Sequence, residues 1–150
     1  MLSDKYLPLL VLLTFWTLWI SVVLITNVFD GLKRYGLLSE NWPFASGNYA
    51  LIEKATSKFN PPAWLNRLFF AGAVVWQAII TILFWTALLN TFKQGRIASS
   101  EISWAFAASF GLFAAFVLAD EICGNYQGER DHLLILAAQV VSYLTLTLLK

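Results

Sequence analysis

The sequence predicts an all-α integral membrane protein, an up-down four-helix bundle with a short amphipathic interfacial helix in its first long loop. Hydrophobic residues make up 59% of the 150 residues and charged residues only 13%, about half the charged share of a soluble domain. Four runs, at about 7–29, 68–92, 102–119 and 133–149, contain no charged residue. They are continuously apolar, without the alternation of barrel strands, so we expect four helical spans in a single domain.

The lengths of the four runs suit helices that cross a bilayer. The first two, of about 23 and 25 residues, exceed the ~18 apolar residues that cross a ~30 Å core. The last two, of about 17 or 18 residues, lie near the lower limit and should use flanking residues or stand more upright. The first run is longer than the core of a signal peptide, and no small-x-small cleavage site precedes Asp30. An uncleaved anchor is therefore predicted.

The first loop, of about 37 residues, has a helix pattern of its own at about 48–59. Ser46-Gly47-Asn48 favours a helix start, and Asn60-Pro61-Pro62 a stop. Between them one side of the helical projection is apolar, with Tyr49, Ile52, Ala55 and Phe59. This pattern indicates an amphipathic helix in the plane of the headgroups. The other two connections are short, which favours antiparallel neighbours.

With antiparallel spans, most residues able to do chemistry gather at the face of the long loop, opposite both termini. The candidate site residues there are Asp30, Arg67, Asp120, Glu121, Gln127 and His132. Arg67 is the expected partner of the Asp120–Glu121 carboxylates. His132 is either a hydrogen-bonding residue or a proton carrier. The alternative for the whole group is a set of ordinary charged boundaries at helix ends.

The third run has a ridge of small residues at every fourth position: Ser103, Ala107, Gly111, Ala115 and Ala119. Such a ridge lets another backbone approach closely. It serves either packing within the chain or docking of another subunit. Within the spans, Asn27, Gln77 and Gln139 are the strongest polar groups. We expect them to form hydrogen bonds between helices.

Several kinds of cofactor and partner are excluded by simple counts. One histidine excludes haem ligated by two histidines, and one cysteine, Cys123, excludes an intrachain disulfide and a multi-cysteine metal site. No nucleotide-binding motif, catalytic motif or metal-ligand spacing is present, so no catalytic or metal residue is assigned. A net charge of +1 does not support nucleic-acid binding. The aromatic residues of the first two spans leave a bound lipid, quinone or pigment open.

A set of positions spread along the chain forms one further pattern: Asn27, Asp30, 48–52 (Asn-Tyr-Ala-Leu-Ile), Trp64, Arg67, Glu121 and Tyr126-Gln127. It resembles an uncharacterised bacterial family of predicted small integral membrane proteins with four spans, a domain of unknown function. Lys54 and the stretch 33–42 depart from the family pattern. The resemblance implies a fold and a membrane location, and it implies no activity.

Three functional hypotheses follow. The leading one is a small polytopic membrane protein of interaction or accessory type, which packs against a larger membrane complex. The alternative is an ion- or small-solute-coupled protein with a polar site at one membrane face. The third is an enzyme acting on a lipid or quinone, although a non-enzymatic role is favoured. Membrane lipid and other subunits, or a second copy, are the expected partners. The expected location is the bacterial inner membrane with cytoplasmic termini, where basic residues are denser in the short segments.

Overall fold

The structure, a computed structural model, describes residues 6–148. Its four long helices are α1 (Tyr6–Arg34), α3 (Ala63–Gln94), α4 (Ser99–Cys123) and α5 (Tyr126–Leu148). A short helix, α2 (Asn48–Thr56), continues directly into the 3-10 turn η1 (Ser57–Phe59). All four long helices are long and apolar enough to cross a membrane. The last predicted span ends at 149, which lies outside the described residues.

The helices extend beyond the apolar runs, and the predicted span boundaries are too narrow. The largest correction concerns the third connection, predicted from Asp120 to Asp131. Only Gly124 and Asn125 separate α4 from α5. Gly124 has φ +63° and donates to the carbonyls of Asp120 and Glu121, while the N–H of Asn125 donates to Asp120 O at 2.9 Å. This glycine C-cap satisfies the last carbonyls of α4, so the helix continues through the acidic residues before it turns.

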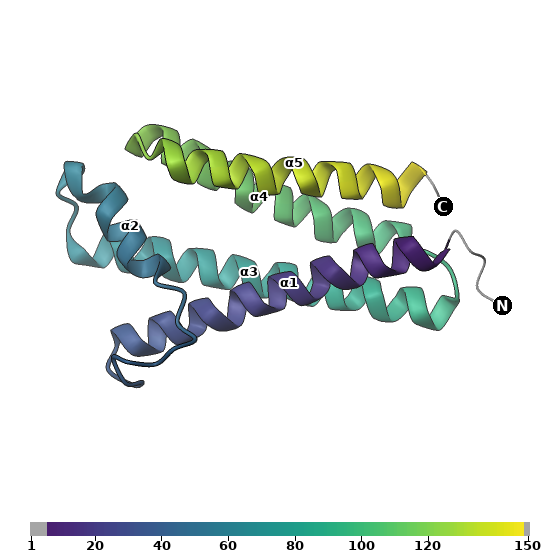
Figure 1. Cartoon of the computed structure of the whole chain (residues 1–150), viewed down its shortest axis with the longest axis horizontal. Helices are drawn as coiled ribbons and strands as arrows, with labels where there is room; N and C mark the ends of the chain where they lie inside the picture. The colour runs from purple at the N-terminus through teal and green to yellow at the C-terminus, as the bar shows by residue number, and fades with distance from the viewer. Residues whose placement is uncertain (1–5, 149–150) are drawn as a thin grey trace.

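Consecutive long helices run in opposite directions (Figure 1). Helix α1 packs on α3, α3 on α4, and α4 on α5, while the contact of α1 with α5 is much smaller. The start of α1 and the end of α5 lie at one end of the molecule, and α2 lies at the other (Figure 1). Toward the α2 end, α1 and α5 diverge (Figure 1).

Aromatic packing closes the end near the termini. Phe106 of α4 is fully buried, and its ring lies 6.5 Å from Trp16 of α1, 5.1 Å from Phe84 of α3 and 5.6 Å from Tyr143 of α5. One side chain therefore contacts all three other long helices. Tilted and edge-on ring pairs at these separations add to the stabilisation from burial. The apolar core lies in this half of the bundle, and the buried carboxylates lie in the other half.

The small-residue ridge of α4 packs against neighbouring helices of the chain at Gly111 and Ser103. Gly111 faces Trp76 of α3, and a Cβ at this position would lie 3.1 Å from the indole ring. The same indole donates from Nε1 to Ala108 O at 3.0 Å. Ser103 shares a hydrogen bond of 3.2 Å with the Tyr143 hydroxyl of α5. The small residues therefore let α4 approach both of its neighbours.

Helix α2 is fastened to α1 through Asp30. The Asp30 carboxylate is buried and accepts the backbone N–H of Tyr49 at 2.8 Å. Gly47, at the N-cap position with φ +77°, offers no side-chain cap, so a carboxylate from another helix takes this role. The Tyr49 ring packs against Phe70 of α3 at 5.3 Å and under the Arg34 guanidinium at 4.7 Å. Asp30 was predicted as a site residue, and in the structure its contacts are those of a helix cap.

Candidate functional site

A buried amide network joins α1, α3 and the start of α2. Asn27 Nδ2 donates to Gln77 Oε1 at 2.8 Å. Asn27 Oδ1 accepts from Ser46 Oγ at 2.6 Å and from Asn48 Nδ2 at 2.8 Å. Both Asn27 and Gln77 are buried. The predicted interhelical hydrogen bonds are confirmed here. They are confirmed again by the two reciprocal hydrogen bonds between Ser109 of α4 and Gln139 of α5.

A second polar cluster joins α4 to α5 through Asp120. Asp120 Oδ2 lies 2.6 Å from His132 Nδ1, and Oδ1 accepts from Asn125 Nδ2 at 2.7 Å. The Asp120 side chain is 12% exposed and that of His132 is 30% exposed. With Asp120 ionised, Nδ1–H is the donor, and in the neutral imidazole the lone pair then lies on Nε2. The cluster therefore fixes the direction in which Nε2 of His132 points.

Gly128 allows this cluster to form. A Cβ at Gly128 would lie 2.3 Å from Asn125 Nδ2 and 3.0 Å from each carboxylate oxygen of Asp120. Distances this short exclude any side chain unless the cluster moves. The His132 ring is also held from the apolar side, because Phe116 packs against it with ring centroids 4.9 Å apart. The Asp120–His132 pair is thus positioned by α4, by α5 and by the short turn that joins these two helices.

A cavity of about 240 Å³ separates the two polar networks. Asn27 and Gln77 line one side, and Asp120 and His132 line the other. Helix α2 contributes Asn48, Leu51, Ile52 and Ala55 to its wall. The cavity occupies the end of the bundle where α1 and α5 diverge, and all five α-helices contribute to it.

An apolar groove of about 680 Å³ lies beside the cavity, between α3 and α4 and next to α2 and η1. Its lining includes Leu68, Gly72 and Trp76 of α3, with Ala115 and Ala119 of the small-residue ridge. The groove and the cavity share five residues: Ile52, Ala55, Ala73, Phe116 and Asp120. A polar compartment and an apolar compartment therefore meet at Asp120.

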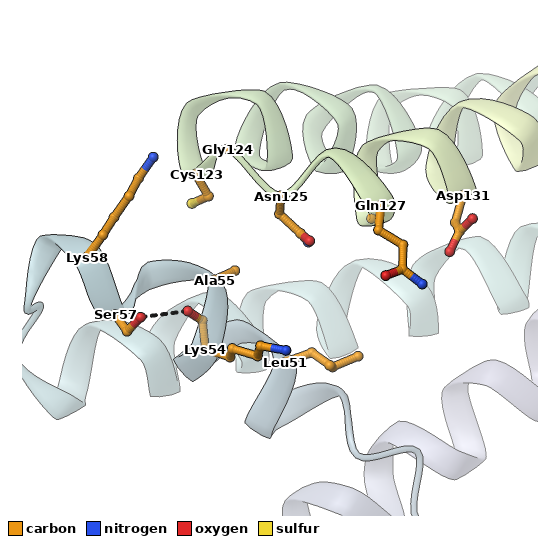
Figure 2. Close-up of a pocket in the computed structure, with 11 residues that line it drawn as sticks. Leu51, Lys54, Ala55, Ser57, Lys58, Cys123, Gly124, Asn125, Gln127 and Asp131 are labelled. Carbon is orange, nitrogen blue, oxygen red and sulfur yellow. Dashed lines mark hydrogen bonds between the residues drawn. The ribbon is translucent and has the colours of Figure 1, made fainter.

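A third hollow, of about 460 Å³, separates α2 and η1 from the α4–α5 hairpin. Figure 2 shows Lys58 extending from η1 toward the hairpin, with Asn125, Gln127 and Asp131 on the opposite wall. Lys54 lies on the same wall as Lys58. We call this hollow the lysine cleft. It shares Ala55 and Cys123 with the apolar groove.

The six predicted site residues are only partly brought together. Asp120 and His132 line the cavity, and Gln127 lines the lysine cleft. Arg67 is exposed and forms no ion pair within residues 6–148, so the expected pairing with Asp120 is wrong. The reason is local: His132 and Asn125 are close in sequence and already occupy the carboxylate. Glu121 is exposed on α4 and lines none of the three hollows.

Three residues that line these hollows, Gly128, Lys54 and Lys58, were not predicted as site residues from the sequence. Gly128 lies in the first turns of α5, where a glycine by itself does not predict a site. Its role becomes clear only in the structure, where the Asp120 side chain packs against its Cα. In the helical projection Lys54 falls on the polar side and Lys58 at its boundary. Both line a cleft only because the α4–α5 hairpin packs opposite them. The part of the chain that the structure describes contains no group of three or more His, Cys, Asp or Glu side chains placed to hold a metal ion.

Comparisons with protein-family models, with curated proteins and with solved structures find no match to this chain. The resemblance to a four-span bacterial family stays a prediction.

Proposed function

We propose that this protein binds an amphiphilic molecule from the membrane, with its hydrocarbon chain in the apolar groove and its polar part in the cavity at Asp120 and His132. The observation that supports this most directly is the wall that groove and cavity share, including Ala55, Phe116 and Asp120. A groove of about 680 Å³ falls in the range of small-molecule sites, which combine apolar walls with a few oriented polar groups.

The chemistry of the cavity suits a polar group without strong charge. Its lining offers the amides of Asn27, Asn48 and Gln77 together with the oriented His132. With Asp120 ionised and the imidazole neutral, Nε2 accepts a hydrogen bond from a ligand hydroxyl, and the amides match carbonyl or hydroxyl oxygens. A hydroxyl, ester or similar linker of an amphiphile fits this set of partners.

The proposal includes a membrane arrangement. The four long helices form an up-down bundle across the bacterial inner membrane with cytoplasmic termini, and α2 lies at the opposite interface. Exposed Trp64 beside Pro62 and the exposed Phe44 support an interfacial level for this end. The groove then opens sideways to lipid, so an amphiphile enters from the bilayer.

Filling the groove should remove the bound amphiphile. Gly72 lines the groove, and an added Cβ there meets nothing within 4 Å. We expect Gly72→Phe to lower the fraction of protein that carries co-purified amphiphile about tenfold, the effect of losing roughly two buried CH₂ groups at ~0.8 kcal/mol each. Native mass spectrometry of the protein released from mild detergent measures this fraction.

The matched control is Ala71→Phe, at the neighbouring exposed position outside the groove. It adds the same ring to the same helix and should leave the bound fraction unchanged. Equal retention by the parent protein and the Gly72→Phe variant would overturn the proposal.

An accessory role in a larger membrane complex is a second proposal, supported by Ala107 and Ala119, the exposed members of the small-residue ridge. We expect Ala107→Phe to abolish co-purification with a larger assembly, because close backbone approach depends on small side chains. Size-exclusion chromatography in mild detergent checks this. A parent protein that elutes only as an isolated monomer would contradict it.

A further inference from the structure

We infer that the amphiphile carries an anionic headgroup, of the phosphate type, which Lys54 and Lys58 hold in the lysine cleft. This inference rests on the proposed function and names the class of its ligand. Both lysines line the cleft (Figure 2), four residues apart along α2 and η1. Lys58 extends toward the hairpin and Lys54 extends along α2 past Leu51 (Figure 2), so the two ammonium groups border the cleft at different places, and an elongated headgroup beside the apolar groove is needed to contact both.

The carboxylates near the lysine cleft already have cationic or hydrogen-bonding partners. Glu53, adjacent to Lys54, pairs with Arg34 at 2.8 Å. Asp131, on the opposite wall, lies 3.6 Å from Arg130. Asp120 is occupied by His132 and Asn125.

The two lysine side chains are available to an anionic ligand. Within residues 6–148 neither Lys54 nor Lys58 forms an ion pair. The Lys58 ammonium lies 4.9 Å from the centre of the Phe59 ring, a contact that does not neutralise it. Glu121 and Glu129 do not line the cleft.

The position of the cleft favours a lipid headgroup over a soluble anion. It shares Ala55 and Cys123 with the apolar groove, and Ala55 also borders the cavity. A ligand with its chain in the groove and its linker at Asp120 can therefore place a headgroup against the lysines without leaving the protein. Lysines at the level of lipid phosphates attract anionic headgroups, and the cleft adds walls that a flat surface lacks.

The test uses the full-length protein in mild detergent with equal amounts of a phosphatidylglycerol and a phosphatidylcholine of the same chains. Native mass spectrometry measures the retention of each lipid. We expect the parent protein to prefer the anionic lipid by about tenfold. The preference should fall to near parity in the double variant Lys54→Gln/Lys58→Gln and persist in Lys54→Arg/Lys58→Arg.

A matched control removes two positive charges at the other end of the bundle, with Lys93→Gln/Arg96→Gln. This variant should keep the preference for the anionic lipid. Loss of the preference in the control would overturn the inference, since overall charge would then explain it. A parent protein that retains both lipids equally would also overturn it.

Two further arms separate the possible failures. If both lipids are retained equally and Gly72→Phe releases both, the anionic headgroup is wrong and the amphiphile site stands. If Gly72→Phe changes nothing, the proposed function itself fails. Inorganic phosphate is added in a separate arm. If phosphate binds the lipid-free protein and displaces the lipid, the occupant of the cleft is a soluble anion. This result would overturn the inference that a lipid headgroup binds there.

Discussion

Replacing Gly128 with alanine is expected to lower the free energy of unfolding by about 1–3 kcal/mol, the usual cost of adding a methyl group to a filled site. The added Cβ would meet Asn125 Nδ2 at 2.3 Å and both Asp120 oxygens at 3.0 Å. The Asn125 amide must move, which breaks its hydrogen bond to Asp120, and a shift of the carboxylate weakens the Asp120–His132 contact as well. Unfolding in mixed micelles of dodecyl sulphate and a mild detergent, followed by circular dichroism, measures the change.

Gly72→Ala is the matched control for this experiment. Both glycines lie inside helices, so both substitutions gain helix propensity. A Cβ at Gly72 meets nothing within 4 Å, so this variant should be neutral or slightly stabilised. The difference between the two variants isolates the contact with the cluster. If Gly128→Ala is as stable as Gly72→Ala, the cluster is looser than the distances indicate, and Gly128 does not position it.

Replacing Asn27 with leucine is expected to lower the free energy of unfolding by about 2 kcal/mol, from three interhelical or loop contacts at roughly 0.6 kcal/mol each. The change removes the hydrogen-bond partner of Gln77 Oε1 and of Asn48 Nδ2, and Ser46 Oγ keeps only its longer contact with Asp30 Oδ2, at 3.3 Å, as a donor. It should also loosen α2, since Ser46 and Asn48 lead into that helix. Dodecyl sulphate titration measures stability, and limited proteolysis of residues 35–47 measures the loosening.

Thr17→Val is the control for Asn27→Leu on the same helix. Thr17 is fully buried, and its hydroxyl donates only to Leu13 O within α1. Losing that bond should cost much less. A double-mutant cycle with Gln77→Leu should show that the two effects are not additive, because the second change removes a group that is already unpaired. A cost for Asn27→Leu no larger than that for Thr17→Val would contradict the network.

The helical class was predictable from sequence because it depends on a strong local signal. Runs without charge that are long enough to cross a bilayer must satisfy their backbone groups internally, and helices do so. The ends of the helices were less predictable. Asp120 and Glu121 stay helical because Gly124 provides a C-cap, whereas a change in hydropathy marks only where the apolar stretch ends.

The candidate site was predictable in position and only partly in composition. Antiparallel spans require Asp120 and His132 to lie at the same end of the bundle as Asp30 and Arg67, and the structure places all four there. Which of them touch depends on side-chain direction around each helix. The Asp120 side chain is directed toward α5 and forms a hydrogen bond with His132, while the Arg67 side chain is exposed. A shift of one position turns a helical residue by about 100°, so these pairings follow only from the packed helices.

Three features could be predicted from the sequence: four apolar helices, a short helix in the first loop, and a polar end opposite the termini. Each follows from hydropathy or from helix signals within one segment of the chain. Three other features are visible only in the packed structure. Helices α1 and α5 diverge, α2 lies beside the resulting cavity, and an apolar groove and a lysine cleft meet near Asp120. A cavity is bounded by several helices at once, so no single segment of the sequence predicts it. Its shape depends on how closely whole helices approach, and a glycine such as Gly128 controls that approach without any signal of its own in composition.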